Sequence, residues 1–308
     1  MSETFDLAII GGGPAGVAAG VYASRKRIKT VFITESFESQ STVSLEIQNW
    51  IGESAISGND LTKKLEAHLR AYAGDFVSIN SREKVTDIKK IENNFEIKTT
   101  KNSYSAKTVL VTSGSNRRKL DIIGADKYDG KGIVYCATCD APMFEGKDVV
   151  VVGGGNSAFE SAIQLFDYCK SVTLINRRNE FRADPITVQK ASENPKLKIL
   201  KNTIPVEVKG DNFVKSLVVK NLETNEQTEL AIEGIFVEIG HIPSTSFAKD
   251  LVETTPEGNI KIDHKTQRTS LSGIWSAGDC TDGLYQQNNI AVGDAIKALE
   301  DIYRWLKK

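Results

Sequence analysis

Two short runs of apolar residues in this chain each lead into a glycine-rich turn and then into a segment of helical composition. The first run is Leu7-Ala8-Ile9-Ile10, and the alanine-rich residues 17–24 follow its turn. The second run is Val149-Val150-Val151-Val152, and residues 159–168 follow its turn. A continuous apolar run bounded by turn residues is typical of a strand buried in a parallel sheet. The pattern therefore predicts two strand, turn and helix units, and with them an α/β fold.

The remaining apolar segments predict the elements that complete these two units. We expect further strands at 30–33, 109–114, 172–175, 214–219, 235–240 and 273–279. An amphipathic pattern predicts helices over 61–73 and 291–307. We infer that 1–115 and 243–308 together form one domain, and that 116–242 is a second domain inserted into it.

The two glycine-rich turns resemble dinucleotide fingerprints. They read Gly11-Gly12-Gly13-Pro14-Ala15-Gly16 and Gly153-Gly154-Gly155-Asn156-Ser157-Ala158. Each has the preceding strand and following helix that an isolated match lacks. Glycines allow the backbone to approach a pyrophosphate, whose charge then lies at the positive end of the following helix. The sequence therefore predicts two Rossmann-like nucleotide-binding domains.

The residues at the end of each second strand distinguish the two nucleotides. An acid about 20 residues beyond a fingerprint accepts hydrogen bonds from a ribose, and Glu35 has this position in the first unit. The first unit therefore suits FAD or NAD. The second unit has Asn176 there, followed by Arg177, Arg178 and Arg182. Because arginines bind a 2'-phosphate that an acid would repel, we expect NADPH in the second unit, with a solvated basic turn as the alternative.

Composition excludes several classes of protein. The 308 residues include 39 basic and 40 acidic ones, with a formal net charge of -1, so no overall field favours nucleic acid or an anionic membrane. No apolar run approaches the roughly 20 residues that span a bilayer. The acidic start, Met1 to Asp6, lacks a signal-peptide pattern, and we expect a cytoplasmic protein.

Cys136 and Cys139 form a Cys-x-x-Cys pair between the two fingerprints. A dithiol reduces a disulfide when one sulfur attacks as the thiolate and the second resolves the mixed disulfide. The alternatives are half of a zinc site and a buried structural pair. Cys169, Cys280 and the three histidines offer no second pair at ligand spacing, so we expect no metal. Cys169 and Cys280 are expected to be small buried residues.

These motifs together resemble the low-molecular-weight thioredoxin reductases and the similar flavoprotein core of the alkyl hydroperoxide reductase large subunit. The resemblance covers both fingerprints, Glu46-Ile47-Gln48-Asn49-Trp50, Cys136 to Asp140, Asn176 to Arg182 and Gly278-Asp279. It implies an FAD domain interrupted by an NADPH domain, a homodimer, and thioredoxin as the partner. It further implies that Cys139 lies nearest the flavin, that Cys136 attacks the partner and that Asp140 is the proton donor, although Asp140 could instead cap a helix.

The resemblance also assigns residues outside the first fingerprint to FAD: Gln40, Asn49, Gly114, Gly278, Asp279, Gln287 and Asn288. Three departures from the family pattern stand out. Glu38-Ser39 replaces a Gly-Gly pair beside the isoalloxazine, Gln286 replaces an arginine, and Asn176 replaces a histidine. We expect the first of these to alter the wall beside the flavin.

The motifs lead to one principal hypothesis and two alternatives. The principal hypothesis is an FAD-dependent enzyme that passes electrons from NADPH through Cys136 and Cys139 to a protein disulfide. The partner could instead be a glutaredoxin-like or peroxiredoxin-linked module, or the electron donor could differ. A low-turnover flavin redox sensor is the third possibility, suggested by Glu38-Ser39 and Gln286.

Overall fold

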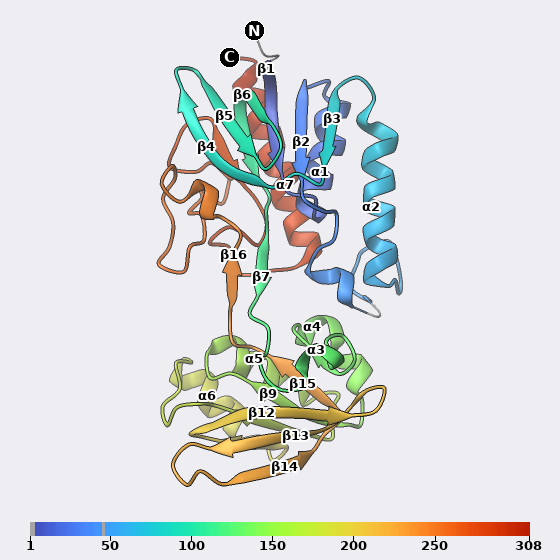
Figure 1. The fold of residues 1–308 in the computed structure, drawn as a ribbon, viewed down its shortest axis with the longest axis vertical. Coiled ribbons are helices and arrows are strands. Elements are labelled where there is room, and N and C mark those ends of the chain that lie inside the picture. The colour runs from blue at the N-terminus through green and yellow to red at the C-terminus, as the bar shows by residue number, and fades with distance from the viewer. Residues whose placement is uncertain (1–3, 45–46) are drawn as a thin grey trace.

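The structure is a computed structural model, and it describes residues 4–44 and 47–308. Glu46, part of one family motif, lies outside the described residues. Two bodies, each built on a parallel sheet, are joined by a pair of short strands, and both chain ends lie at the far end of the first body (Figure 1). No helix within the described ranges is long and apolar enough to cross a membrane.

The first body contains a seven-stranded sheet of order β3-β2-β1-β6-β5-β4, with β17 beside β6. Strands β3, β2, β1, β6 and β17 are parallel, whereas β5 and β4 are antiparallel additions. The strands are β1 (Thr4–Ile10), β2 (Thr30–Thr34), β3 (Val77–Ser81), β4 (Val85–Ile91), β5 (Asn94–Thr99), β6 (Ser103–Val111) and β17 (Ile274–Ser276). The helices are α1 (Pro14–Arg25), α2 (Gly58–Ala73) and α7 (Asn288–Leu306), with 3-10 turns η1 (Gln40–Val43) and η3 (Ser246–Ala248).

The apolar run of β1 is buried on both faces. Leu7 and Ile9 belong to the core beneath α1 and α7, while Ala8 and Ile10 face a second core with the antiparallel strands. A strand covered on both faces needs continuous rather than alternating hydrophobicity, which is the pattern that predicted it. Helix α7 begins at Asn288, three residues before the predicted start at Ala291, because it opens with Asn288 and Asn289, which are polar and weak helix formers.

The second body contains a five-stranded parallel sheet of order β11-β10-β9-β15-β8. Helices cover one face and an antiparallel sheet, β12-β13-β14, covers the other. The strands are β8 (Ile133–Val134), β9 (Asp148–Val152), β10 (Ser171–Ile175), β11 (Leu197–Leu200), β12 (Thr203–Gly210), β13 (Val214–Asn221), β14 (Gln227–Ala231) and β15 (Gly234–Val237). The helices are α3 (Ala125–Tyr128), α4 (Ala137–Asp140), α5 (Asn156–Leu165) and α6 (Pro185–Ser192), with the 3-10 turn η2 (Ala141–Phe144).

Two antiparallel strands, β7 (Ser115–Arg117) and β16 (His241–Pro243), connect the bodies (Figure 1). Gly114 and Gly240 border them with φ of +65° and +94°, a region that side chains other than hydrogen disfavour. The first sheet draws strands from both ends of the sequence, and the second draws all its strands from the middle. This arrangement is the predicted α/β fold, with one nucleotide-binding domain interrupted by another.

Candidate functional site

A cleft of about 970 Å³ opens at the carboxyl ends of the first parallel strands. Its wall brings together most residues that the sequence assigned to FAD. They are Gly11, Gly13, Pro14, Ala15, Glu35, Gln40, Gly114, Gly278, Asp279 and Asn288. Asn49 and Gln287 line a smaller adjoining cavity, so the predicted set, Gly16 excepted, forms one connected surface.

The first fingerprint needs glycine for close packing as well as for the cleft. A Cβ on Gly16 would lie 1.9 Å from the carbonyl oxygen of Gly11 and 2.9 Å from Oγ1 of Thr112. Gly11 itself has φ of +118°, and a Cβ there would lie 2.3 Å from the Thr112 carbonyl oxygen. Gly16 is absent from the cleft wall, so its role is to let α1 pack against the turn.

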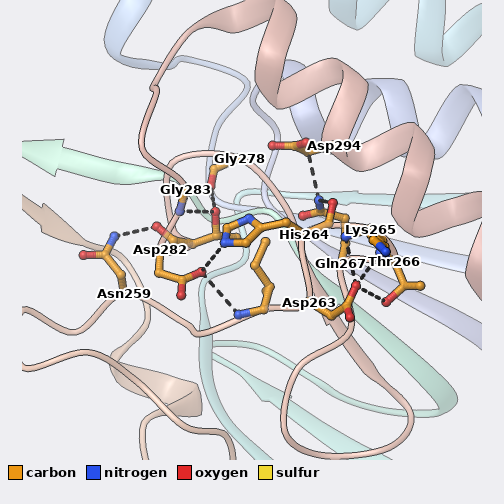
Figure 2. Close-up of polar contacts among 12 residues, drawn as sticks. Asn259, Asp263, His264, Lys265, Thr266, Gln267, Gly278, Asp282, Gly283 and Asp294 are labelled. Atoms are coloured by element: carbon orange, nitrogen blue, oxygen red, sulfur yellow. Dashed lines mark hydrogen bonds and ion pairs between the residues drawn. The ribbon is translucent and has the colours of Figure 1, made fainter.

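Hydrogen bonds brace the turn that carries Gly278 and Asp279 (Figure 2). Thr281 Oγ1 donates to the Gly278 carbonyl at 2.8 Å, and Asn259 Nδ2 donates to the Thr281 carbonyl at 2.9 Å. The Asp279 carboxyl accepts no hydrogen bond from residues 4–44 or 47–308, and burial raises its pKa. This carboxyl is therefore held at the cleft with its acceptor capacity open to a ligand hydroxyl.

The loop of Glu38, Ser39 and Gln40 accommodates the departure from Gly-Gly. Ser39 has extended backbone, with φ of -132°, and its backbone N–H donates to Thr42 Oγ1 at 2.9 Å. Any residue can adopt this backbone conformation. Ser39 therefore gives no support to the expectation that replacing Gly-Gly alters the wall beside the flavin. Glu38 lines the cleft and adds an exposed carboxylate to it.

Cys136 and Cys139 are joined in a disulfide, with Cα atoms 5.3 Å apart. Cys136 caps the short helix α4, and its Sγ accepts the Cys139 backbone N–H at 3.2 Å. Both cysteines line the cavity that Asn49, Asp279 and Gln287 also line, although the cysteines belong to the second body. A flavin in the cleft of the first body would therefore meet the disulfide of the second.

Asp140 is buried at the seam between the bodies. Ser44 Oγ donates to its Oδ1 at 3.2 Å. Burial raises the pKa of Asp140 from an ordinary 3.8 to about 6, against smaller opposing effects of the Ser44 hydrogen bond and the Arg117 charge. The Asp140 side chain makes no capping hydrogen bond at η2, so the geometry argues against the alternative that Asp140 only caps a helix. A carboxyl of this pKa can hold a proton near neutral pH.

Arg117 is a site residue that sequence reasoning missed. It lines both cavities, and its Nε donates to Gln40 Oε1 at 3.0 Å. Its charge acts on Asp140, Glu238 and Asp279. Gln40 Nε2 in turn donates to Ser115 Oγ at 2.9 Å. The only sequence signal was the basic pair Arg117-Arg118 beside the predicted domain boundary.

Gln286, the replacement for the family arginine, also bonds across the seam. Its Nε2 lies 3.0 Å from Nε2 of His241 in β16. Because an amide NH2 only donates, the imidazole Nε2 accepts and is unprotonated. Burial lowers the pKa of His241, which agrees with this neutral form. Asn49 Nδ2 donates to Gln287 Oε1 at 3.0 Å, and Ser41 Oγ donates to Asn288 Oδ1 at 3.0 Å.

The second fingerprint precedes α5 at the carboxyl end of β9. A Cβ on Gly153 would lie 2.4 Å from the Glu238 carbonyl oxygen, so this turn requires glycine. Gly155 has no atom within 4 Å of its Cβ position, and Asn156 and Ser157 are exposed at the helix start. The N–H groups of this first turn are therefore open to a pyrophosphate.

Asn176 shapes the loop that carries the arginines. It is buried, and its Nδ2 donates to the carbonyl oxygens of Arg178 and Glu180 at 2.8 and 2.9 Å. The backbone N–H of Arg182 donates to the Gly154 carbonyl at 2.8 Å, which ties the loop to the fingerprint. Arg177, Arg178 and Arg182 are exposed and form no ion pair within the described residues. Asn176 thus stabilises the conformation of the loop, and the guanidinium groups stay open to an anion.

Cys169 and Cys280 are free and buried, as the sequence analysis expected. Burial raises the pKa of the Cys169 thiol to about 11, so it stays protonated and unreactive at neutral pH. Within residues 4–44 and 47–308, no group of three or more histidine, cysteine or acidic side chains could hold a metal ion.

Comparison with known proteins places this architecture among redox enzymes. The family model for pyridine nucleotide-disulphide oxidoreductases matches residues 5–295. An alkyl hydroperoxide reductase protein of Pseudomonas putida is 40% identical over 299 residues, which are 96% of this chain and 57% of that protein. The chain thus spans little more than half the length of the alkyl hydroperoxide reductase relatives that it matches.

Two solved structures of similar identity fit the chain differently. Thioredoxin reductase from Giardia duodenalis is 35% identical, with a TM-score of 0.93 and complete coverage of both chains. Lactococcus lactis thioredoxin reductase in its FR conformation is 34% identical and covers 98% of this chain and 99% of its own, yet its TM-score is 0.67. Since the identities are nearly equal, the difference points to a different arrangement of similar parts.

Proposed function

The chain belongs to the pyridine nucleotide-disulphide oxidoreductase family, and on this basis we propose that it is an FAD-dependent disulfide reductase. It oxidises NADPH and reduces a protein disulfide, with thioredoxin as the partner. The observation that carries the proposal is the Cys136–Cys139 disulfide, held in a cavity that adjoins the first nucleotide cleft while the pair belongs to the second nucleotide-binding body.

The residues of the cleft fit the cofactor by their chemistry. The glycine turn and the start of α1 receive the pyrophosphate, Glu35 is placed for the ribose, and Asp279 for the ribityl hydroxyls. FAD, when bound, accepts a hydride from the nicotinamide and passes the electron pair on to the disulfide. Cys139 is assigned to face the isoalloxazine, and Cys136 to attack the partner. Asp140, with its raised pKa, supplies the proton for the leaving thiolate.

The disulfide and the NADPH site belong to one body, while the flavin cleft belongs to the other. We infer that the second body rotates about β7 and β16, so that the disulfide and the nicotinamide reach the flavin in turn. The hydrogen bond from Ser44 of the first body to Asp140 of the second would hold one of the two positions. The two TM-scores at nearly equal identity support this motion.

A cross-link across the seam tests the rotation. Gln286 of the first body and Met143 of the second body line the same cavity, so Gln286→Cys and Met143→Cys would be joined by a bis-maleimide in the oxidised protein, whose native cysteines are paired or buried. We expect the linked protein to keep electron exchange between flavin and disulfide but to lose flavin reduction by NADPH. The unlinked double variant is the control. Full turnover in verified linked protein contradicts rotation.

Cysteine variants test the function itself. Cys139→Ser should leave the flavin reducible by NADPH under anaerobic conditions but abolish thioredoxin reduction, because the hydride reaches the flavin before any sulfur takes part. Cys136→Ser should leave Cys139 as a lone thiolate beside the flavin and produce a long-wavelength absorbance band. Wild-type thioredoxin reduction by both variants would reject the proposal.

A second partner is supported by the likeness to the alkyl hydroperoxide reductase relatives. In that case electrons pass to a separate peroxiredoxin-linked disulfide module, and reduction assays with both partners distinguish the two.

The family resemblance also supports a homodimer, which sedimentation equilibrium would test. We retain a cytoplasmic location as a proposal, and fractionation of the source cells would check it. The domain limits 1–115, 116–242 and 243–308 also remain proposals, testable by limited proteolysis at the two crossings.

A further inference from the structure

Glu238 is a partly buried acid that the disulfide chemistry does not use. It follows β15 directly, and its backbone N–H donates to the Val152 carbonyl at the end of β9 at 2.8 Å. Its own carbonyl oxygen is the atom against which a Cβ on Gly153 would collide. Glu238 therefore lies beside the second fingerprint, where the carboxyl ends of β9 and β15 meet.

The order of the second sheet makes this the expected ligand crevice. From β9 the chain crosses through α5 to β10 on one side, while β15 lies on the other side. Ligands of open α/β sheets bind where the strand order reverses, outside the carboxyl ends of the strands. Arg177 and Arg178, after β10, fix the adenosine 2'-phosphate on the β10 side, and α5 receives the pyrophosphate. The nicotinamide then extends to the β15 side, where Glu238 lies.

The contacts of Glu238 leave one carboxyl oxygen available. Ser161 of α5 is buried, and its Oγ donates to Glu238 Oε1 at 2.8 Å. Within residues 4–44 and 47–308, Oε2 accepts no hydrogen bond. A carboxylate fixed through one oxygen and free at the other is suited to accept a hydrogen bond from a bound ligand.

We propose that Glu238 recognises the nicotinamide end of the dinucleotide, with Oε2 accepting a hydrogen bond from the carboxamide NH2 while Ser161 positions the carboxyl through Oε1. This inference rests on the proposed use of NADPH. Oxidation of a dihydronicotinamide leaves a positive charge on its ring, and a nearby carboxylate stabilises that charge. Glu238 would therefore favour bound NADP⁺ as well as orient the ring.

The charges around Glu238 connect this role to pH. Burial raises its pKa to about 6, with Arg117 of β7 and Ser161 acting against the rise and Glu160 of α5 adding to it. The carboxyl is therefore ionised above about pH 6 and neutral below. A neutral carboxyl is the weaker acceptor, so affinity for NADP⁺ falls as the pH drops through this value.

Calorimetric titration of the FAD-loaded protein tests the assignment without an activity readout. The ligands are NADP⁺ and adenosine 2',5'-bisphosphate, which carries the same phosphate but no nicotinamide. Glu238→Ala should weaken NADP⁺ binding about tenfold or more, because a hydrogen bond to a charged group is lost, and Ser161→Ala should weaken it less. Binding of the bisphosphate should not change. Glu238→Gln, which keeps the shape and an acceptor, should lose less affinity. It should also lose the part of the pH dependence near 6 that NADP⁺ shows beyond the bisphosphate, because the phosphates of both ligands titrate near the same pH.

Glu233→Gln is the matched control. Glu233 directly precedes the first residue of β15, at the end of the strand away from Glu238, and the Glu233 side chain is exposed. The substitution therefore removes one carboxylate charge without touching the crevice. Flavin absorbance and circular dichroism confirm that each variant is folded. NADP⁺ affinity in Glu238→Ala equal to that of Glu233→Gln overturns the role of Glu238, and so does an equal loss for both ligands. Wild-type protein that binds neither ligand contradicts instead the proposed use of NADPH.

Discussion

The two nucleotide units begin with the same three glycines but differ at the next three positions, of which the sixth shows the contrast between them most clearly. In the first unit this residue is Gly16, whose Cβ position lies 1.9 Å from the Gly11 carbonyl oxygen. In the second unit it is Ala158, and its Cβ fits beside Gly153. The first helix therefore approaches its turn more closely than the second does. Equivalent motif positions thus carry different steric demands, which only the packing of each helix reveals.

The units also differ where their second strands end. Glu35 is exposed at the cleft and lies 3.6 Å from Lys84 Nζ, so its carboxylate can turn to a ribose. Asn176, its counterpart, is buried and bonded to its own loop. One position presents its side chain to the cleft, and the other builds the loop that carries the exposed arginines. An amide is needed at Asn176 because the partners are carbonyl oxygens, which require a donor.

The largest expected effect comes from exchanging the sixth fingerprint residues. Gly16→Ala places a methyl group against backbone and should lower the free energy of unfolding by more than about 3 kcal/mol, with loss of FAD. Ala158→Gly should cost only about 1 kcal/mol through helix propensity. Urea unfolding and flavin absorbance would measure both. Equal losses in the two variants would contradict the steric difference between the units.

An intermediate effect is expected at the arginines of the second unit. Each charge-assisted pair with a phosphate contributes about 1.5 to 3 kcal/mol. Arg177→Ala combined with Arg178→Ala should therefore lower kcat/KM for NADPH by at least about a hundredfold and leave NADH little changed. Steady-state kinetics with both donors would show this. Unchanged NADPH constants would mean that these residues form a solvated turn and that the two units do not differ in nucleotide as proposed.

The last effect is expected at Asp140, where the two units meet, and it depends on pH. Its pKa is about 6 in the folded protein and ordinarily 3.8, a difference of about 2 units or about 3 kcal/mol. Because the folded state binds the proton more tightly, burial of the carboxylate destabilises the protein increasingly as the pH rises from about 4 to about 6, and fully above that. Asp140→Asn should thus be more stable than wild type at pH 8, by up to about 3 kcal/mol.

At pH 4.5 the advantage of Asp140→Asn should shrink to about 1 kcal/mol, since wild-type Asp140 is then nearly fully protonated in the folded state but mostly ionised in the unfolded state. Urea unfolding at the two pH values checks the difference, and thioredoxin reduction should fall in the variant because the proton donor is lost. An advantage independent of pH would show that the seam does not raise this pKa.

The sequence by itself determined the central strands of the two parallel sheets, the fingerprints and the redox pair, but not the outer strands of either sheet. These features depend on neighbouring residues, because apolar runs, glycine turns and a Cys-x-x-Cys spacing act over a few positions. Helix ends were less well determined: α7 begins with Asn288 and Asn289, two polar residues of low helix propensity, ahead of the predicted start at Ala291. The steric need for Gly16 and the role of Asn176 also required coordinates.

Only the tertiary structure decided what lies at the seam and in the crevice. Ser44 and Asp140 are 96 positions apart, and Arg117 and Gln40, like Ser161 and Glu238, are 77 apart. No local pattern marks such pairs, because each contact follows from how two elements pack rather than from spacing along the chain. The pKa of Asp140 and of Glu238 depends on the same packing, since burial is its main cause.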